Sequence, residues 1–136
     1  MRLNRFIPMA GLFAITTLSA CSDSSPFEPN AATLNGTWAE EGEVPGSSEV
    51  WNLSVDGAHV TGTGTWSGEA CCGGTLTIDG QIRGDSIYLG IKRNGSPFLP
   101  PTTVTTIGAV LRSPTEMAAS VQPNSGGSEF RMRKQP

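Results

Sequence analysis

The sequence has few of the residues that catalysis requires. It holds a single histidine, His59, and only 15% of its residues are charged. His59 alternates with threonines in a strand-like segment, a pattern typical of a solvent-exposed side chain rather than of a general base. No Gly-x-Ser-x-Gly nucleophile motif is present, and the spacing of Gly62, Gly64 and Gly68 differs from that of a dinucleotide-binding loop. We therefore expect no enzyme activity and no catalytic residue.

Basic charge is also scarce, since nine Lys and Arg stand against twelve Asp and Glu for a formal net charge of −3. Nucleic-acid-binding domains usually carry a basic patch, so we expect no nucleic-acid partner. A structural metal site takes about four ligands at recognisable spacing, which one histidine and the adjacent Cys71 and Cys72 do not supply. No metal or other cofactor is therefore expected. Glu40, Glu41 and Glu43 are interpreted as a solvated acidic loop.

No apolar run is long enough for a permanent transmembrane helix, but a shorter one lies near the N-terminus. Arg2 and Arg5 precede an apolar run over residues 6–17. A helix that crosses a hydrocarbon core of ~30 Å needs about 20 apolar residues. A charged start, a short apolar middle and small residues at the end are instead typical of an export signal. We predict a signal peptide over residues 1–20.

The residues that follow the apolar run are Leu18-Ser19-Ala20-Cys21. They resemble the lipobox of bacterial lipoproteins. The resemblance implies that the Cys21 thiol receives a diacylglyceryl group, that the Ala20–Cys21 bond is cut, and that the new amine is acylated, for example with palmitate. Because Ser22 rather than Asp follows the cysteine, the resemblance favours a lipid anchor in the outer membrane, with the domain facing the periplasm or the cell surface. An ordinary signal peptide followed by an unrelated cysteine is the alternative.

The mature chain divides into two parts. Residues 21–33 carry two prolines and no apolar periodicity, so we expect Cys21 to be followed by a flexible tether. From Leu34 to residue 136, apolar and polar residues alternate between turn sequences such as Asp56-Gly57. The strands expected from this alternation cover residues 36–40, 50–56, 58–67, 75–83, 86–92, 102–112, 116–121 and 128–134.

These hairpin-linked segments predict an all-β fold, a small antiparallel up-and-down β-barrel of about eight strands. A β-sandwich is the alternative. Closure into a barrel would leave no exposed sheet edge. The apolar residues of the alternation should lie inside, and we expect a monomer. The predicted interior includes Trp51, Leu53, Val60, Leu76, Ile78, Leu89 and Phe130.

Two segments resemble the calycin group, which comprises lipocalins and avidin-like barrels. Gly36-Thr37-Trp38 matches the Gly-x-Trp that opens the first lipocalin strand, and residues 34–38 and 61–66 are similar to early strands of avidin-like proteins. The resemblance implies a barrel whose Trp38 packs across the closed end against an arginine of a late strand. Arg131 and Arg133 are the candidates, although the alternation of Phe130 and Met132 places both arginines on the outside.

The resemblance also gives two expectations for function. The first is a membrane-anchored lipoprotein whose lipocalin-like barrel binds a small apolar or amphipathic ligand without catalysis, with Trp38, Trp51 and Trp66 as candidate ligand-binding residues. The second is a structural or protein-interaction lipoprotein of the envelope with a filled core, in which the tryptophans serve packing. Glycines at inward positions, such as Gly62 and Gly64, would either make room for a ligand or accommodate the tryptophans.

Cys71 and Cys72 remain as the thiols of the mature domain in an oxidising compartment. Neighbouring Cα atoms lie about 3.8 Å apart, less than in most disulfides, but the following Gly73 and Gly74 give the loop conformational freedom. We consider a vicinal Cys71–Cys72 disulfide, free or intermolecularly paired thiols, and a redox or metal function.

Overall fold

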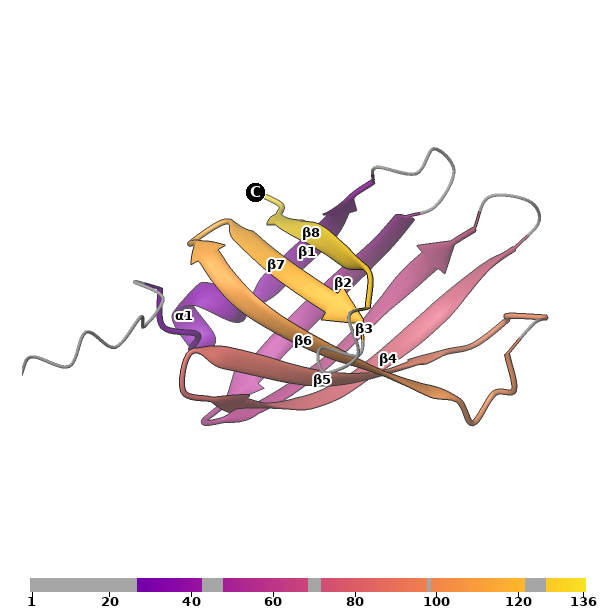
Figure 1. Cartoon of the computed structure of the whole chain (residues 1–136), viewed down its shortest axis with the longest axis horizontal. Helices are drawn as coiled ribbons and strands as arrows, with labels where there is room; N and C mark the ends of the chain where they lie inside the picture. Colours follow the sequence, from indigo (N-terminus) through magenta and orange to yellow (C-terminus); the bar gives the residue numbers. More distant parts are fainter. Residues whose placement is uncertain (1–26, 43–47, 69–71, 98, 122–126) are drawn as a thin grey trace, which may run out of the picture.

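The computed structural model describes residues 27–42, 48–68, 72–97, 99–121 and 127–136. In this part of the chain, eight strands form one closed antiparallel barrel in which each strand pairs with the next and β8 closes on β1 (Figure 1). The predicted up-and-down barrel is confirmed, and the sandwich alternative is wrong. The strands are β1 (Gly36–Glu41), β2 (Ser48–Asp56), β3 (His59–Ser67), β4 (Gly73–Arg83), β5 (Ser86–Arg93), β6 (Val104–Ser113), β7 (Glu116–Val121) and β8 (Glu129–Lys134).

The strands form where the alternation predicts them, with each end within two residues of the expected position. In β2, for example, Trp51, Leu53 and Val55 are buried and the residues between them are exposed. This period of two arises because successive side chains of a strand point to opposite faces. In β6, whose facing the sequence left open, Ile107 and Leu111 point inward and are completely buried.

The barrel interior is filled by apolar side chains. The predicted interior residues are buried, apart from Phe130, which is partly buried and packs on the others. The rings of Phe130 and Trp51 meet edge to face, with centroids 5.9 Å apart and an interplanar angle of 87°. The buried core consists of Leu34, Trp38, Trp51, Leu53, Val55, Val60, Leu76, Ile78, Ile87, Leu89, Ile91, Ile107, Ala109, Leu111, Met117, Ala119 and Met132.

One end of the barrel is closed by the short helix α1 (Ala31–Leu34), beside the tight turns that follow β2, β4 and β6 (Figure 1). The indole Nε1 of Trp38 donates a hydrogen bond of 2.9 Å to the Leu34 carbonyl. The Lys134 ammonium lies 5.6 Å from the centroid of the Trp38 ring and donates to the Thr33 carbonyl at 2.8 Å. The cation against Trp38 is therefore Lys134 of β8, and Arg131 and Arg133 lie at exposed positions.

Part of the predicted tether belongs to the folded domain. Asn30 and Thr33 form a reciprocal capping box at the start of α1: the Asn30 side chain accepts from the Thr33 backbone at 3.1 Å, and the Thr33 hydroxyl accepts from the Asn30 backbone at 2.9 Å. Phe27 also packs on the core. The tether predicted over residues 21–33 therefore extends too far toward the barrel. The sequence did not reveal α1 because a helix of one turn has no apolar periodicity. Residues 21–26 lie outside the described residues.

The paired residues of the eight strands all lie between positions 36 and 134. Helix α1 and Phe27 also contact this barrel, so every described contact of the domain lies within residues 27–136. The experiments below therefore use residues 22–136, which we call the lipid-free chain. No helix in the described part of the molecule is long and apolar enough to span a membrane.

The inward glycines of β3 allow close approach of neighbouring strands. A Cβ atom on Gly64 would lie 1.9 Å from the Val50 carbonyl oxygen and 3.1 Å from the Leu76 side chain. A Cβ on Gly62 would lie 2.7 Å from the Asn52 carbonyl oxygen. The space beside these glycines is already occupied by the neighbouring backbone and core side chains. They therefore serve the packing of the barrel and leave no room for a ligand.

Gly64→Ala should lower the free energy of unfolding by about 1–3 kcal/mol, the usual cost of overpacking. The matched control is Thr63→Val, an exposed β-branched residue next to it on the same strand, which should change stability by less than about 0.5 kcal/mol. Urea denaturation of the lipid-free chain measures both. An unchanged urea midpoint for Gly64→Ala would show that β2 can move away from β3 without a loss of stability.

Candidate functional site

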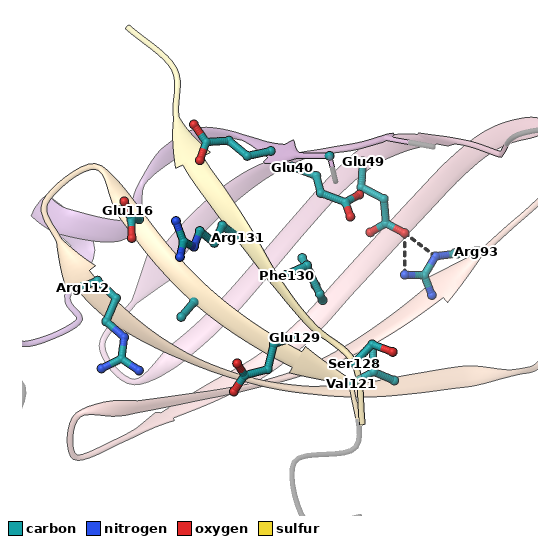
Figure 2. Close-up of a pocket in the computed structure, with 13 residues that line it drawn as sticks. Glu40, Glu49, Arg93, Arg112, Glu116, Val121, Ser128, Glu129, Phe130 and Arg131 are labelled. Atoms are coloured by element: carbon teal, nitrogen blue, oxygen red, sulfur yellow. Dashed lines mark hydrogen bonds and ion pairs between the residues drawn. The ribbon is translucent and has the colours of Figure 1, made fainter. Parts of the chain in front are cut away.

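The end of the barrel opposite α1 is lined by polar and apolar side chains, which are partly buried except for the exposed Ser128. We call it the mouth and define it by inward-facing residues of the strands together with Ser128 (Figure 2). A cavity of about 870 Å³ includes the mouth and continues over the outward positions of β6, β7 and β8, where Arg112, Glu116 and Arg131 lie. The mouth consists of Glu40, Glu49, Arg93, Val121, Ser128 and Phe130.

A partly buried ion pair crosses the mouth between β2 and β5, which are not neighbours in the barrel. The Arg93 side chain contacts one carboxylate oxygen of Glu49 through Nε at 2.6 Å and Nη2 at 2.5 Å (Figure 2). The two side chains are only 18% and 14% exposed. The other oxygen of Glu49 accepts from Trp51 Nε1 at 2.9 Å, and Arg93 Nη1 donates to the Thr105 hydroxyl at 3.1 Å. Both charged groups are thereby fixed in orientation.

Glu40 is a second inward carboxylate, on β1 next to β2. Its side chain points toward Glu49 in Figure 2. Burial raises the pKa of Glu40 above its ordinary value, and repulsion from the Glu49 carboxylate raises it further, while a backbone hydrogen bond from Glu49 and the charge of Arg93 act in the opposite direction. Glu40 is thus partly desolvated and lies beside a like charge.

An apolar surface adjoins these charges. Phe130 and Val121 line the cavity, and Phe130 rests on the completely buried Trp51, which forms the floor of the mouth. Trp66 is partly buried at the same end, and its Nε1 donates to the Asn94 carbonyl at 3.0 Å. The mouth therefore combines a fixed ion pair, an additional carboxylate and an aromatic surface.

The structure separates the three tryptophans that the sequence analysis proposed as ligand-binding residues. Trp38 lies at the closed end and Trp51 under the mouth, and both are completely buried. Among the described residues that line the cavity, none of the three tryptophans is found. Trp38 and Trp51 are packed in the core, and ligand binding by the three tryptophans stays a prediction.

The charged residues of the mouth were not predicted from the sequence, although the sequence contains a signal for them. Glu49 precedes Trp51 at an inward position of β2, and Arg93 follows Ile91 at an inward position of β5. Glu40 is likewise in phase with Trp38 rather than part of a solvated loop. When the alternation places a charged residue at an inward position near the end of a strand, it indicates that the mouth of the barrel is polar.

The remaining candidate residues lie elsewhere. His59 is on the outer surface, where its Nε2 lies 3.0 Å from the Asp79 carboxylate and both side chains are more than half exposed. In the described residues, no three His, Cys, Asp or Glu side chains gather as metal ligands would. Cys72 is disulfide-bonded. Cys71 and Cys21 lie outside the described residues, so the Cys71–Cys72 pairing and the lipidation of Cys21 stay predictions.

We predict that changing Cys71 and Cys72 together to serine alters the free energy of unfolding by less than about 1 kcal/mol. A bridge between neighbours closes almost no chain, so it gains little from loop-closure entropy. Mass spectrometry of unreduced, alkylated protein establishes the bridge, and urea denaturation with and without reductant measures its effect. Two alkylatable thiols would exclude the bridge, and a large loss of stability on reduction would place this loop in the core.

Comparisons of this chain with protein-family profiles, with curated proteins and with solved structures found no match. The interpretation of the mouth therefore depends on its own geometry and on the sequence patterns described above.

Proposed function

We propose that this protein is a lipid-anchored lipoprotein of the bacterial outer membrane whose barrel holds a small amphipathic molecule at the mouth without changing it chemically. The observation that carries this proposal is the cavity in which Glu40, Glu49 and Arg93 adjoin Phe130 and Val121. Binding sites for small molecules typically combine an apolar surface with a few fixed polar groups, and the mouths of β-barrels are a common place for them.

The position of the N-terminus supports the proposal. The described chain enters the barrel through α1 at the closed end, so an anchor at Cys21 would attach there (Figure 1). Two or three acyl chains are enough for stable membrane attachment, whereas one is marginal. Because the mouth lies at the opposite end, it would open away from the membrane and toward dissolved ligands.

A structural or protein-interaction role in the envelope is the second candidate. The filled interior below Trp51 favours it, because buried apolar side chains occupy that part of the described barrel. This candidate predicts that small amphipathic molecules leave the mouth unoccupied.

The experiment that separates the two candidates is NMR titration of the lipid-free chain with octanol, octanoate and octylamine. Ligand binding at the mouth predicts shifts of the Trp51 indole N–H, the Arg93 Nε–H and the Val121 methyl groups, with the Trp38 indole N–H at the closed end as internal control. Unchanged spectra with all three compounds at millimolar concentration would contradict the proposed function and favour the second candidate.

A further inference from the structure

We infer from the arrangement of Glu40, Glu49 and Arg93 that the mouth selects an amphipathic cation, with Glu40 as the residue that pairs with the ammonium group of the ligand. This inference rests on the proposed function, because it names the chemical class of the molecule that the mouth would hold.

The Glu49–Arg93 pair is not available to a ligand. One Glu49 oxygen contacts Arg93 and the other accepts from Trp51, while the Arg93 guanidinium also donates to Thr105. A ligand that displaced either partner would leave the other charge partly buried and unpaired, which is strongly unfavourable. The Glu49–Arg93 pair therefore forms one wall of the mouth, and its two opposite charges add no net charge.

Glu40 supplies the charge that remains. The mouth contains two carboxylates and one guanidinium, so it carries an excess of one negative charge when Glu40 is ionised. The wider cavity has the same sign, with five glutamates against three arginines along its lining. An ammonium group beside Glu40 would compensate this charge, whereas a carboxylate at the same place would add a third negative group.

The apolar part of such a ligand fits next to Glu40. Phe130 and Val121 line the same cavity, and the wholly buried Trp51 closes the barrel below them. The filled core prevents a long chain from entering the barrel. The site therefore matches a short alkyl or aryl group that carries one ammonium, rather than a fatty acid extended along the barrel axis.

The test compares three eight-carbon compounds that differ in their head groups. Isothermal titration of the lipid-free chain at neutral pH should give the order octylamine, then octanol, then octanoate. We expect octylamine to bind about tenfold more tightly than octanol, which is the factor for one hydrogen bond to a charged group. The wild-type order is itself a test and does not depend on any variant.

Two variants test whether Glu40 is the residue that causes the preference for a cation. Glu40→Gln removes the charge with little change in size, so the affinity for octylamine should fall about tenfold, while the affinity for octanol stays the same. Glu41→Gln is the matched control: Glu41 is the next residue of β1 and also lines the wider cavity, but it lies outside the mouth, is exposed, and is paired with Arg133 at 2.5 Å. The control should keep the wild-type order. Thermal unfolding of each variant confirms that it is folded.

The outcomes separate this inference from the proposed function. Equal affinities for octylamine and octanol would overturn the cation preference and leave ligand binding at the mouth in place. Tightest binding of octanoate would also overturn it and would point to Arg112 or Arg131 on the outer side of the cavity. Loss of octylamine binding in Glu41→Gln but not in Glu40→Gln would assign the cation to the outer surface. Failure of all three compounds to bind would contradict the proposed function itself.

Discussion

Replacing Trp38 by alanine should lower the free energy of unfolding by about 3–5 kcal/mol, the range for truncating a large buried aromatic residue. Trp38 is completely buried. Its indole N–H donates a hydrogen bond to the Leu34 carbonyl of α1, and its ring makes a cation–π contact with the Lys134 ammonium. The substitution therefore leaves a cavity and also releases the closure of one barrel end. Since small domains have total stabilities of about 5–15 kcal/mol, the variant should be close to unfolding.

Urea denaturation of the lipid-free chain measures this effect, with Trp66→Ala as the matched control. Trp66 is of the same residue type but is only partly buried and lies at the other end of the barrel, so its loss should be distinctly smaller. A Trp38→Ala variant that loses less than about 1 kcal/mol, below the cost of a usual core truncation, would show that the closed end does not depend on this residue.

Cys21→Ala should abolish lipid attachment and block normal removal of the signal peptide. The proposed lipobox requires the thiol for attachment of the diacylglyceryl group, and cleavage follows this step. If the proposed lipobox is correct, the variant lacks its acyl chains and loses roughly 0.8 kcal/mol of membrane affinity for each CH₂ that they would bury.

Labelling of cells with radioactive palmitate, followed by mass spectrometry of the purified protein, tests this prediction. A Cys71→Ala variant is the control, because it removes a cysteine outside the motif and should be labelled normally. Label that persists on the Cys21→Ala protein would exclude the lipobox interpretation, and a wild-type protein without label would favour an ordinary signal peptide.

The barrel is predictable from the sequence because its determinants are local. The alternation of Trp51, Leu53 and Val55 identifies β2 and its inner face, and Asp56-Gly57 fixes the hairpin that pairs β2 with β3. Consecutive hairpins leave few topologies open, and the absence of free edges favours closure. None of these inferences requires knowledge of which residues meet across the barrel.

The mouth is less predictable because its contacts cross the barrel. Glu49 and Arg93 are distant in sequence and on strands that do not pair, so they meet only once the barrel is closed and its registers are set. The contact of Lys134 with Trp38 depends in the same way on the pairing of β8 with β1. Period-two alternation shows that a side chain points inward, but it does not show which partner the side chain finds there.

The most direct test of ligand binding at the mouth is native mass spectrometry of the protein purified from its own host and freed of the N-terminal segment that we predict to carry lipid. We expect a mass above that of the polypeptide, with one small amine-containing molecule released on denaturation. The excess mass should disappear in Val121→Trp, which fills the mouth. A folded barrel from the host whose mass equals that of its polypeptide alone would contradict ligand binding by this protein.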